Sequence, residues 1–114
     1  MQYMLMLYVQ EAGWLELTPE QQEQGMAAYH AYTEALSKAG ALKLTNQLSP
    51  SSVATTVRLE NGRPRVLDGP YTDSKEQIGG YYLIEAPDLD AALAWAARCP
   101  AADHGVVEVR PVIG

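Results

Sequence analysis

The chain is poor in residue types on which several classes of protein depend. Its single cysteine, Cys99, allows no internal disulfide and no multi-cysteine zinc site. The apolar residues around Cys99 favour a packed core residue over a nucleophile. Only eight Lys and Arg residues stand against fourteen Asp and Glu, and they are scattered along the chain. This balance argues against direct binding of the nucleic-acid backbone.

Long apolar runs and nucleotide-binding motifs are also missing. No apolar stretch reaches the roughly 18 residues of a membrane span, and the start, MQYMLMLYVQE, has neither the basic region nor the cleavage site of a signal peptide. We therefore expect a cytoplasmic protein without a membrane partner. The phosphate loop, GxGxxG and GxSxG are absent, so we expect no cofactor. The two histidines, His30 and His104, lack the spacing of metal ligands, which gives little support to a metal site.

The residues that are present predict one domain, residues 1–114, with alternating strands and helices. Residues 2–9 are apolar on both faces, which is typical of a central strand. Thr18, Pro19 and Gln21 form a helix start that includes a capping box, and Gly40 suits the helix end. The connection at 11–17 carries Trp14 and is expected to fold back as a lid.

The second half repeats this order around a hairpin. Residues 41–48 predict a strand with Leu42 and Leu44 on one face, and 53–59 and 63–67 predict a hairpin turning at Asn61-Gly62. Residues 77–86 predict a strand that Gly79-Gly80 interrupts with a bulge or a close backbone approach. Asp88 caps a helix that ends near residues 99–100, and 105–112 predict the last strand.

This order predicts a ferredoxin-like α+β fold, an antiparallel sheet with two helices on one face and an extra hairpin strand. The other face of the sheet would be open and apolar, because the first strand is hydrophobic on both sides. An exposed apolar patch of that size is usually an interface. We therefore expect a homodimer whose sheets meet face to face.

Motifs across nearly the whole chain resemble the YCII-related family, in its DGPF subgroup. They are DGPY at 68–71, SKEQIGGYY at 74–82, DLD at 88–90 with WAARCP at 95–100, and VEVRPV at 107–112. The resemblance implies a dimeric α+β barrel. Two positions depart from the subgroup pattern, Tyr71 in place of phenylalanine and Asp73 in place of the commoner glutamate, and both keep the character of the side chain.

The resemblance also implies a candidate acid-base pair, because some members of the broader superfamily have a proposed His-Asp pair. Asp68 matches the aspartate, and His30 matches the histidine, although the helix could equally be aligned with Tyr29 at that position. His30 lies roughly 40° from Met26 around the helix, at the rim of the apolar stripe, where it could face a cleft or solvent.

Asp68 has two readings from the residues alone. Its side chain can accept the backbone N–H groups that follow and close an Asx turn, with Pro70 fixing the next bend. It can also act as a general acid or base, because Asp73 and Glu76 are close enough in sequence to contribute a like-charge field. A capping box from Asp73 to Glu76 over one helical turn is the structural alternative for those two carboxylates.

A second group of residues could line a pocket for a small anion or an oxygenated ring. Arginine suits this role because its guanidinium makes bidentate contacts. The charged strand residues Arg58, Glu108 and Arg110 could equally form cross-strand ion pairs. Tyr81 and Tyr82 point to opposite faces of their strand, so one belongs to the core and the other can join the pocket. The candidate substrate-binding residues are Arg58, Tyr71, Tyr82, Glu108 and Arg110.

Two functions follow from these observations. The first is a cofactor-independent small-molecule enzyme or binder that uses Asp68, with His30, as acid or base in a cleft at the dimer interface. The second is a non-enzymatic dimeric accessory protein associated with transcription initiation, as a companion of sigma factors, which the resemblance implies. Convergence of Asp68 and His30 would favour the first, and an Asp68 carboxylate occupied by backbone donors would favour the second.

Overall fold

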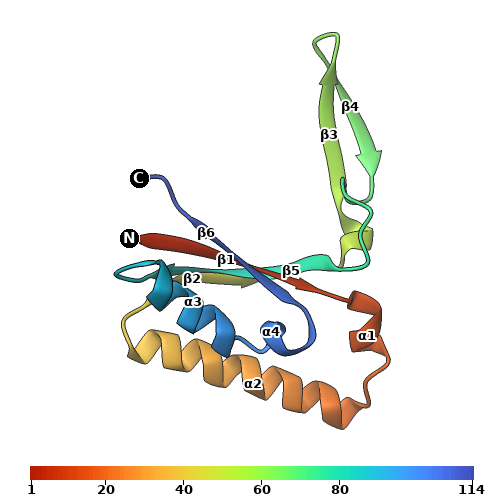
Figure 1. The fold of residues 1–114 in the computed structure, drawn as a ribbon. Helices are drawn as coiled ribbons and strands as arrows, with labels where there is room; N and C mark the ends of the chain where they lie inside the picture. Colours follow the sequence, from red (N-terminus) through yellow and green to blue (C-terminus); the bar gives the residue numbers. More distant parts are fainter.

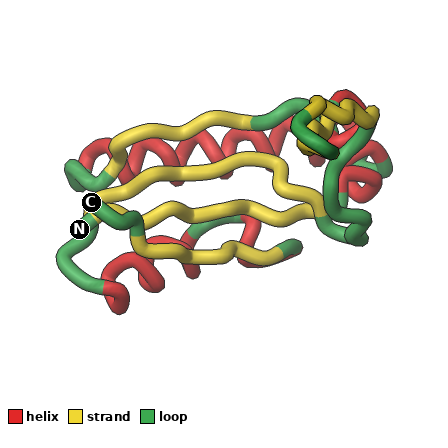
Figure 2. The backbone as a smooth tube through the Cα atoms, turned by 90° about the horizontal axis from the view of Figure 1, so that it is seen from above, coloured by secondary structure: helices red, strands yellow, loops and turns green.

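The computed structural model describes all residues from 1 to 114 and is built on a four-stranded antiparallel sheet. The strands are β1 (Gln2–Val9), β2 (Leu42–Gln47), β5 (Gln77–Glu85) and β6 (Val106–Pro111). Their order is β2-β5-β1-β6, so the first strand is central, as its two apolar faces predicted. The helices lie on one side of this sheet (Figures 1 and 2). The expected ferredoxin-like α+β fold is confirmed.

Two long helices cover the sheet, and two short ones were not predicted. The helix α2 (Pro19–Lys38) begins with the expected capping box between Thr18 and Gln21 and is followed by Gly40 at φ 72°. The helix α3 (Leu89–Arg98) is capped by Asp88, whose side chain accepts the Ala91 N–H. The short helices α1 (Glu11–Leu15) and α4 (Ala101–His104) form in segments expected to be connections. None of the helices is long and apolar enough to cross a membrane.

The core lies between the sheet and these helices. Tyr3, Leu5 and Leu7 of β1 face inward, while Met4, Met6 and Tyr8 are only partly covered on the opposite face. The inward side chains of β5 and of both long helices complete the core, and they are Tyr82, Ile84, Tyr32, Leu36, Ala92 and Ala96. Cys99 is 2% exposed, which confirms its prediction as a packed residue. The sheet is therefore covered on one face and open on the other.

Two bulges shape the sheet, and sequence predicted one of them. Leu7 pairs with Gly80 and Tyr8 with Ile78, so Gly79 is the extra residue at the predicted position. The second bulge was missed. Leu42 pairs with Ile84 and Leu44 with Leu83, which places the two leucines on opposite faces. The expectation that they share a face is therefore wrong, because Lys43 is an extra residue that shifts the register by one.

The predicted hairpin forms, but it stands apart from the main sheet. The strands β3 (Thr55–Glu60) and β4 (Arg63–Asp68) pair only with each other and follow a short 3₁₀ turn, η1 (Ser51–Val53). Asn61 at φ 52° and Gly62 at φ 76° give both central turn residues the positive values of a type I′ turn, as predicted. We call residues 55–68 the arm. It rises on the side of the sheet opposite to α2 (Figure 1).

Residues 11–17, which were expected to fold back as a lid, pack against α2. This segment forms α1, and its Trp14 ring lies so close to α2 that a Cβ added at Gly25 would come within 3.0 Å of it. The Gln22 side chain donates a hydrogen bond to the Trp14 carbonyl oxygen at 2.9 Å. This close approach explains the glycine at position 25.

Candidate functional site

The hollow at the base of the arm gathers three of the predicted site residues. It has a volume of about 420 Å³, and Arg58, Asp68 and Tyr71 all line it. The Arg58 guanidinium lies over the Tyr71 ring, with Cζ 5.8 Å from the ring centroid and Nη2 3.5 Å from the hydroxyl oxygen. The remaining lining residues are Thr56, Glu60, Arg65, Leu67, Gly69 and Pro70. A cation and an aromatic ring thus border one open space, and Asp68 lies at its edge where β4 ends.

Backbone contacts around Gly69 hold the shape of this hollow. Gly69, at φ 100°, donates its N–H to the Ala54 carbonyl oxygen at 2.7 Å and accepts a bond from Thr56 Oγ1 at 2.8 Å. The exposed Asp68 side chain accepts no hydrogen bond, so the expected Asx turn does not form. The reason is that strand pairing continues to Thr55 and Asp68, which leaves Gly69 to make the bend. The carboxylate therefore remains free.

The loop from the arm to β5 contains no helical turn. Residues 71–76 are bends and irregular chain, and the Glu76 N–H donates to Ser74 Oγ at 3.3 Å. The capping box expected between Asp73 and Glu76 is therefore wrong. The Gln77 side chain donates to the Ser74 carbonyl oxygen at 2.7 Å and so joins the loop to the start of β5.

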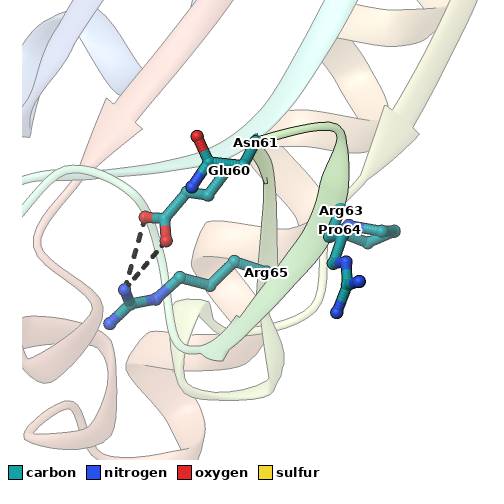
Figure 3. A pocket seen from close by; sticks show the side chains of 5 residues that line it. All are labelled: Glu60, Asn61, Arg63, Pro64 and Arg65. Carbon is teal, nitrogen blue, oxygen red and sulfur yellow. Dashed lines mark hydrogen bonds and ion pairs between the residues drawn. The ribbon is translucent and has the colours of Figure 1, made fainter.

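A second hollow lies at the tip of the arm. It has a volume of about 560 Å³ and is lined by Glu60, Asn61, Arg63, Pro64 and Arg65. Arg65 Nη1 lies 3.1 and 3.3 Å from the two Glu60 carboxylate oxygens, while the Arg63 side chain points away from this pair (Figure 3). Because all five residues are exposed, this hollow is an open surface between side chains and contains no buried polar group.

The open face of the sheet holds another part of the predicted site. Glu108 and Arg110 lie opposite Met6 and Met4 and therefore share their face. Arg110 Nη2 is 2.7 Å from the Glu108 carboxylate, so the ion-pair alternative is correct for these two, although the pair lies within one strand and does not cross between strands. The apolar residues around it are Met4, Met6, Tyr8, Leu44, Ile78, Tyr81 and Leu83.

Tyr82 does not belong to either surface. It is 5% exposed and packs edge-on against Tyr32, with ring centroids 5.2 Å apart. Its hydroxyl group shares a 2.8 Å hydrogen bond with Thr33 Oγ1. Its assignment to the substrate pocket is therefore wrong, and Tyr81 is the member of the pair that lies on the open face, where its hydroxyl accepts a bond from Asn46 Nδ2. The prediction that Tyr81 and Tyr82 lie on opposite faces is confirmed, but Tyr82 is the core residue of the two.

His30 and Asp68 lie on opposite sides of the sheet within one chain. His30 is exposed on α2, below the sheet, whereas Asp68 ends the arm that rises above it (Figure 1). Tyr29, the other residue aligned with the family histidine, is half-buried, and desolvation, with smaller contributions from Cys99 and Tyr82, raises its pKa to about 12. A single chain thus brings Arg58, Tyr71 and Asp68 together and leaves His30 apart.

Glu11 is a structural residue of the site that sequence reasoning missed. Its carboxylate accepts bonds from the Ser51 N–H at 2.8 Å and from Ser51 Oγ at 2.9 Å. The Glu11 N–H donates to Gln77 Oε1 at 3.2 Å. These contacts tie α1, η1 and β5 together where the arm leaves the body. No local pattern marks Glu11, because its partners are 40 and 66 residues away in the chain.

No group of three His, Cys, Asp or Glu side chains lies close enough together to hold a metal ion. The side chains that line the hollow can offer hydrogen bonds, ion pairing and aromatic stacking. These are the contacts that orient a small polar molecule in a protein pocket.

Comparison with known proteins agrees with this architecture. The chain is 34% identical over 114 residues to an uncharacterized protein, R00369, of Rhizobium meliloti strain 1021, covering 98% of this chain and 92% of that protein. Among solved structures it is similar to 5-chloro-2-hydroxyhydroquinone dehydrochlorinase of Burkholderia phenoliruptrix AC1100, in complex with 2,5-dihydroxybenzoquinone. That similarity has a TM-score of 0.57 at 16% identity and covers 99% of this chain and 94% of the other, which supports the shared fold. The family model of the YCII-related domain matches residues 1–114, and the chain therefore belongs to the YCII-related family.

Proposed function

We propose that the protein binds a small oxygenated ring compound in the hollow at the base of the arm, and that Asp68 moves a proton on it without a cofactor. The observation that carries this proposal is that Arg58, Tyr71 and Asp68 line one hollow, with the Arg58 guanidinium over the Tyr71 ring. Among the exposed carboxylates, Asp68 combines freedom from hydrogen bonds with a position beside an arginine and an aromatic ring.

Each side chain has a role that its chemistry supports. The Arg58 guanidinium donates paired N–H groups to a carboxylate or phenolate oxygen, and Tyr71 offers its ring for stacking. Asp68 accepts a proton from a ring hydroxyl or carbon and returns it to another atom of the same ligand, so that no proton or electron is left over. The glycine at position 69, at φ 100°, allows the bend that follows Asp68.

The proposed site is completed in a homodimer with the open faces of two sheets together. The hollow lies on the same side of the molecule as the open face, so a second copy would exclude water from it and strengthen its electrostatic contacts. The solved neighbour, a dehydrochlorinase of a hydroxyhydroquinone, supports the choice of an oxygenated ring as the ligand class. His30 would join this site only if a second copy brought it there, so the proton transfer is assigned to Asp68.

A second function is favoured by the arm. Val57, Leu59 and Val66 are exposed to solvent on it, which suits the surface of a non-enzymatic accessory or regulatory protein, such as a companion of sigma factors in transcription initiation. In that case the protein would bind another protein through the arm and would turn over no small molecule.

The proposal is tested by calorimetry and by turnover assays with 2,5-dihydroxybenzoquinone, hydroxyhydroquinones and cyclic carboxylic acids at about pH 6 and 8. We expect R58A to weaken binding at least about tenfold, equal to about 1.4 kcal/mol. D68N should retain binding within a few fold but lower turnover by about 10² to 10⁴-fold.

D73N is the matched control, because Asp73 is an exposed carboxylate of the same segment that does not line the hollow. H30Q should also leave binding and turnover unchanged. If D73N and D68N lose the same activity, or if no ring compound binds, the proposed site is wrong. Binding of a protein partner without any turnover would support the accessory function.

A further inference from the structure

We propose that the arm is a clasp for a second copy of this chain, and that its apolar face packs against the body of that copy. This inference rests on the homodimer in the proposed function and adds the element that would hold it together. The apolar face of the arm consists of Val57, Leu59, Pro64 and Val66, and the polar pair Thr55 and Asp68 ends this face at the base of the arm. Val57 pairs with Val66 and Leu59 with Pro64, so all four side chains lie on one side of the ribbon.

These side chains have no partner within their own chain. Val57, Leu59 and Val66 are 63, 69 and 59% exposed, although they are β-branched or large apolar residues in regular strands. The other side of the ribbon is mainly polar, with Arg58 opposite Arg65 and Glu60 opposite Arg63. An isolated two-stranded hairpin is at best marginally stable in water, and it gains stability when its apolar face is covered. Apolar and polar side chains thus alternate along the strands of the arm, and its apolar face is exposed to solvent.

The position of the arm favours a copy of the chain as this cover. The arm rises on the same side as the open face of the sheet (Figure 1). Six residues of strand span about 20 Å, and two sheets packed face to face lie about 10 Å apart. Each arm would therefore pass the edge of the opposing sheet and reach the helices behind it. The open face and the apolar face of the arm would be buried by one event.

The size of the contact gives a second reason. Four strands spaced about 4.8 Å apart and about 20 Å long offer a flat area of roughly 400 Å². A stable interface buries about 800 Å² on each partner. The arm adds a further face of roughly 200 Å², and the surface that receives the arm of the other copy adds as much again. Sheet and arm together match the required area, whereas the sheet alone does not.

Charge favours the same partner. Three of the eight Lys and Arg residues lie on the arm, at 58, 63 and 65, whereas twelve of the fourteen Asp and Glu residues lie outside it. Residues 10–37, which include α1 and most of α2, contain five glutamates and no Lys or Arg. A weakly basic arm that reaches the helices of an acidic body brings opposite charges together. In a twofold pair each copy gives one arm and receives one.

The test compares V57E/V66E with L89E/L93E by sedimentation of the full chain. Leu89 and Leu93 are the matched controls, since they are exposed apolar residues of α3 that lie outside the arm, the hollow and residues 10–37. We expect wild type and L89E/L93E to sediment at twice the mass of the 12.4 kDa chain. V57E/V66E should dissociate with a Kd at least about 100-fold higher, because two carboxylates would have to be buried in the contact. Circular dichroism will check that the variants fold.

Amide hydrogen exchange of the wild-type protein keeps the test independent of any folding defect in the variant. Arm amides should exchange more slowly at about 100 µM than at about 1 µM, in parallel with dimer formation. A dimer that V57E/V66E leaves intact, with arm exchange independent of concentration, would overturn the clasp and leave the proposed ligand site untouched. A wild-type monomer at about 100 µM would overturn both the clasp and the dimer, while ligand binding by calorimetry would still judge the ring-binding site.

Discussion

At the scale of single residues, a cluster of buried tyrosines is the clearest electrostatic feature. Desolvation raises the pKa of Tyr29 to about 12, and it also raises the pKa of Tyr32 and Tyr82. The Tyr32 hydroxyl donates to the Trp95 carbonyl oxygen at 2.7 Å, which links α2 to α3. Burial also raises the pKa of the Cys99 thiol. All four groups favour the neutral form in the folded protein.

This cluster predicts a loss of stability in alkali. A folded pKa above the unfolded value means that the stabilisation is complete below about pH 10 and is lost as the pH rises toward the folded pKa. For Tyr29 this window lies between about pH 10 and 12. Y29F should therefore have the same free energy of unfolding as the wild type at pH 7. Above pH 10 its free energy of unfolding should fall less than that of the wild type, as measured by urea unfolding across that range. Equal alkaline loss in both proteins would contradict the assignment to Tyr29.

Glu11 leads to a second prediction at this scale. E11A should lower the free energy of unfolding by about 2 kcal/mol, because hydrogen bonds to a charged group contribute about 1.5–3 kcal/mol. It should also speed amide exchange at Ser51, whose N–H bonds the carboxylate. E16A is the control, since Glu16 is exposed and makes no ion pair. If E11A and E16A have the same free energy of unfolding, the contact between Glu11 and Ser51 does not stabilise the fold.

The residues of the hollow were partly predictable. The motif around Asp68 and Tyr71 and the arginine at 58 were singled out from sequence, and the structure places them around one hollow. Tyr82 was assigned to the wrong face because alternation separates two neighbours without saying which one the helices cover. Glu11 could not be found, since its role depends on contacts that form only after the chain has folded.

At the scale of elements, the sequence predicted those features that a few neighbouring residues determine. The Thr18 capping box, the Asn61-Gly62 turn and the Gly79 bulge all lie where the sequence placed them. The bulge at Lys43 has no such marker, because it results from the fit of β2 against β5. The separation of the arm from the sheet is also a matter of packing, since the pattern of its strands suits either arrangement.

The junction between α4 and β6 gives a prediction for an element. A Cβ at Gly105 would overlap the Tyr8 carbonyl oxygen in the neighbouring strand, and that oxygen belongs to rigid backbone. G105A should therefore lower the free energy of unfolding by about 2–4 kcal/mol. G13A is the matched control in α1, where the added Cβ meets only Gln10 at 3.9 Å, and it should be neutral or slightly stabilising. Thermal unfolding of both variants measures the difference, and similar melting temperatures would refute the overlap.

At the scale of the whole molecule, the uncovered face of the sheet is the main surface to explain. Sequence indicated it through the first strand, whose two faces are both apolar. It could not indicate the arm as a separate body, because strand patterns do not specify the direction in which a hairpin leaves the fold. The shape that results has one side packed and one side open (Figures 1 and 2).

M6E tests the role of the open face. Met6 lies at the middle of β1 between Tyr81 and Glu108, so a carboxylate there would be buried in any sheet-to-sheet contact. We expect M6E to sediment as a folded monomer under conditions in which the wild type is a dimer. L89E, at the exposed start of α3 and outside residues 10–37, should keep the wild-type mass. A dimeric M6E would mean that the copies associate through another surface.

The two tryptophans have a practical consequence for experiments on this protein. Trp95 is stacked under Arg98, with Cζ 4.5 Å from its ring centroid, and touches Tyr32 edge-on in the core. Trp14 lies in the groove left by Gly25 at the outer end of α2. The molecule thus contains two intrinsic fluorophores in different surroundings. In W95F the emission wavelength of the remaining Trp14 would report the release of α1 alone. In W14F the emission wavelength of Trp95 would report the packing of α3 against α2.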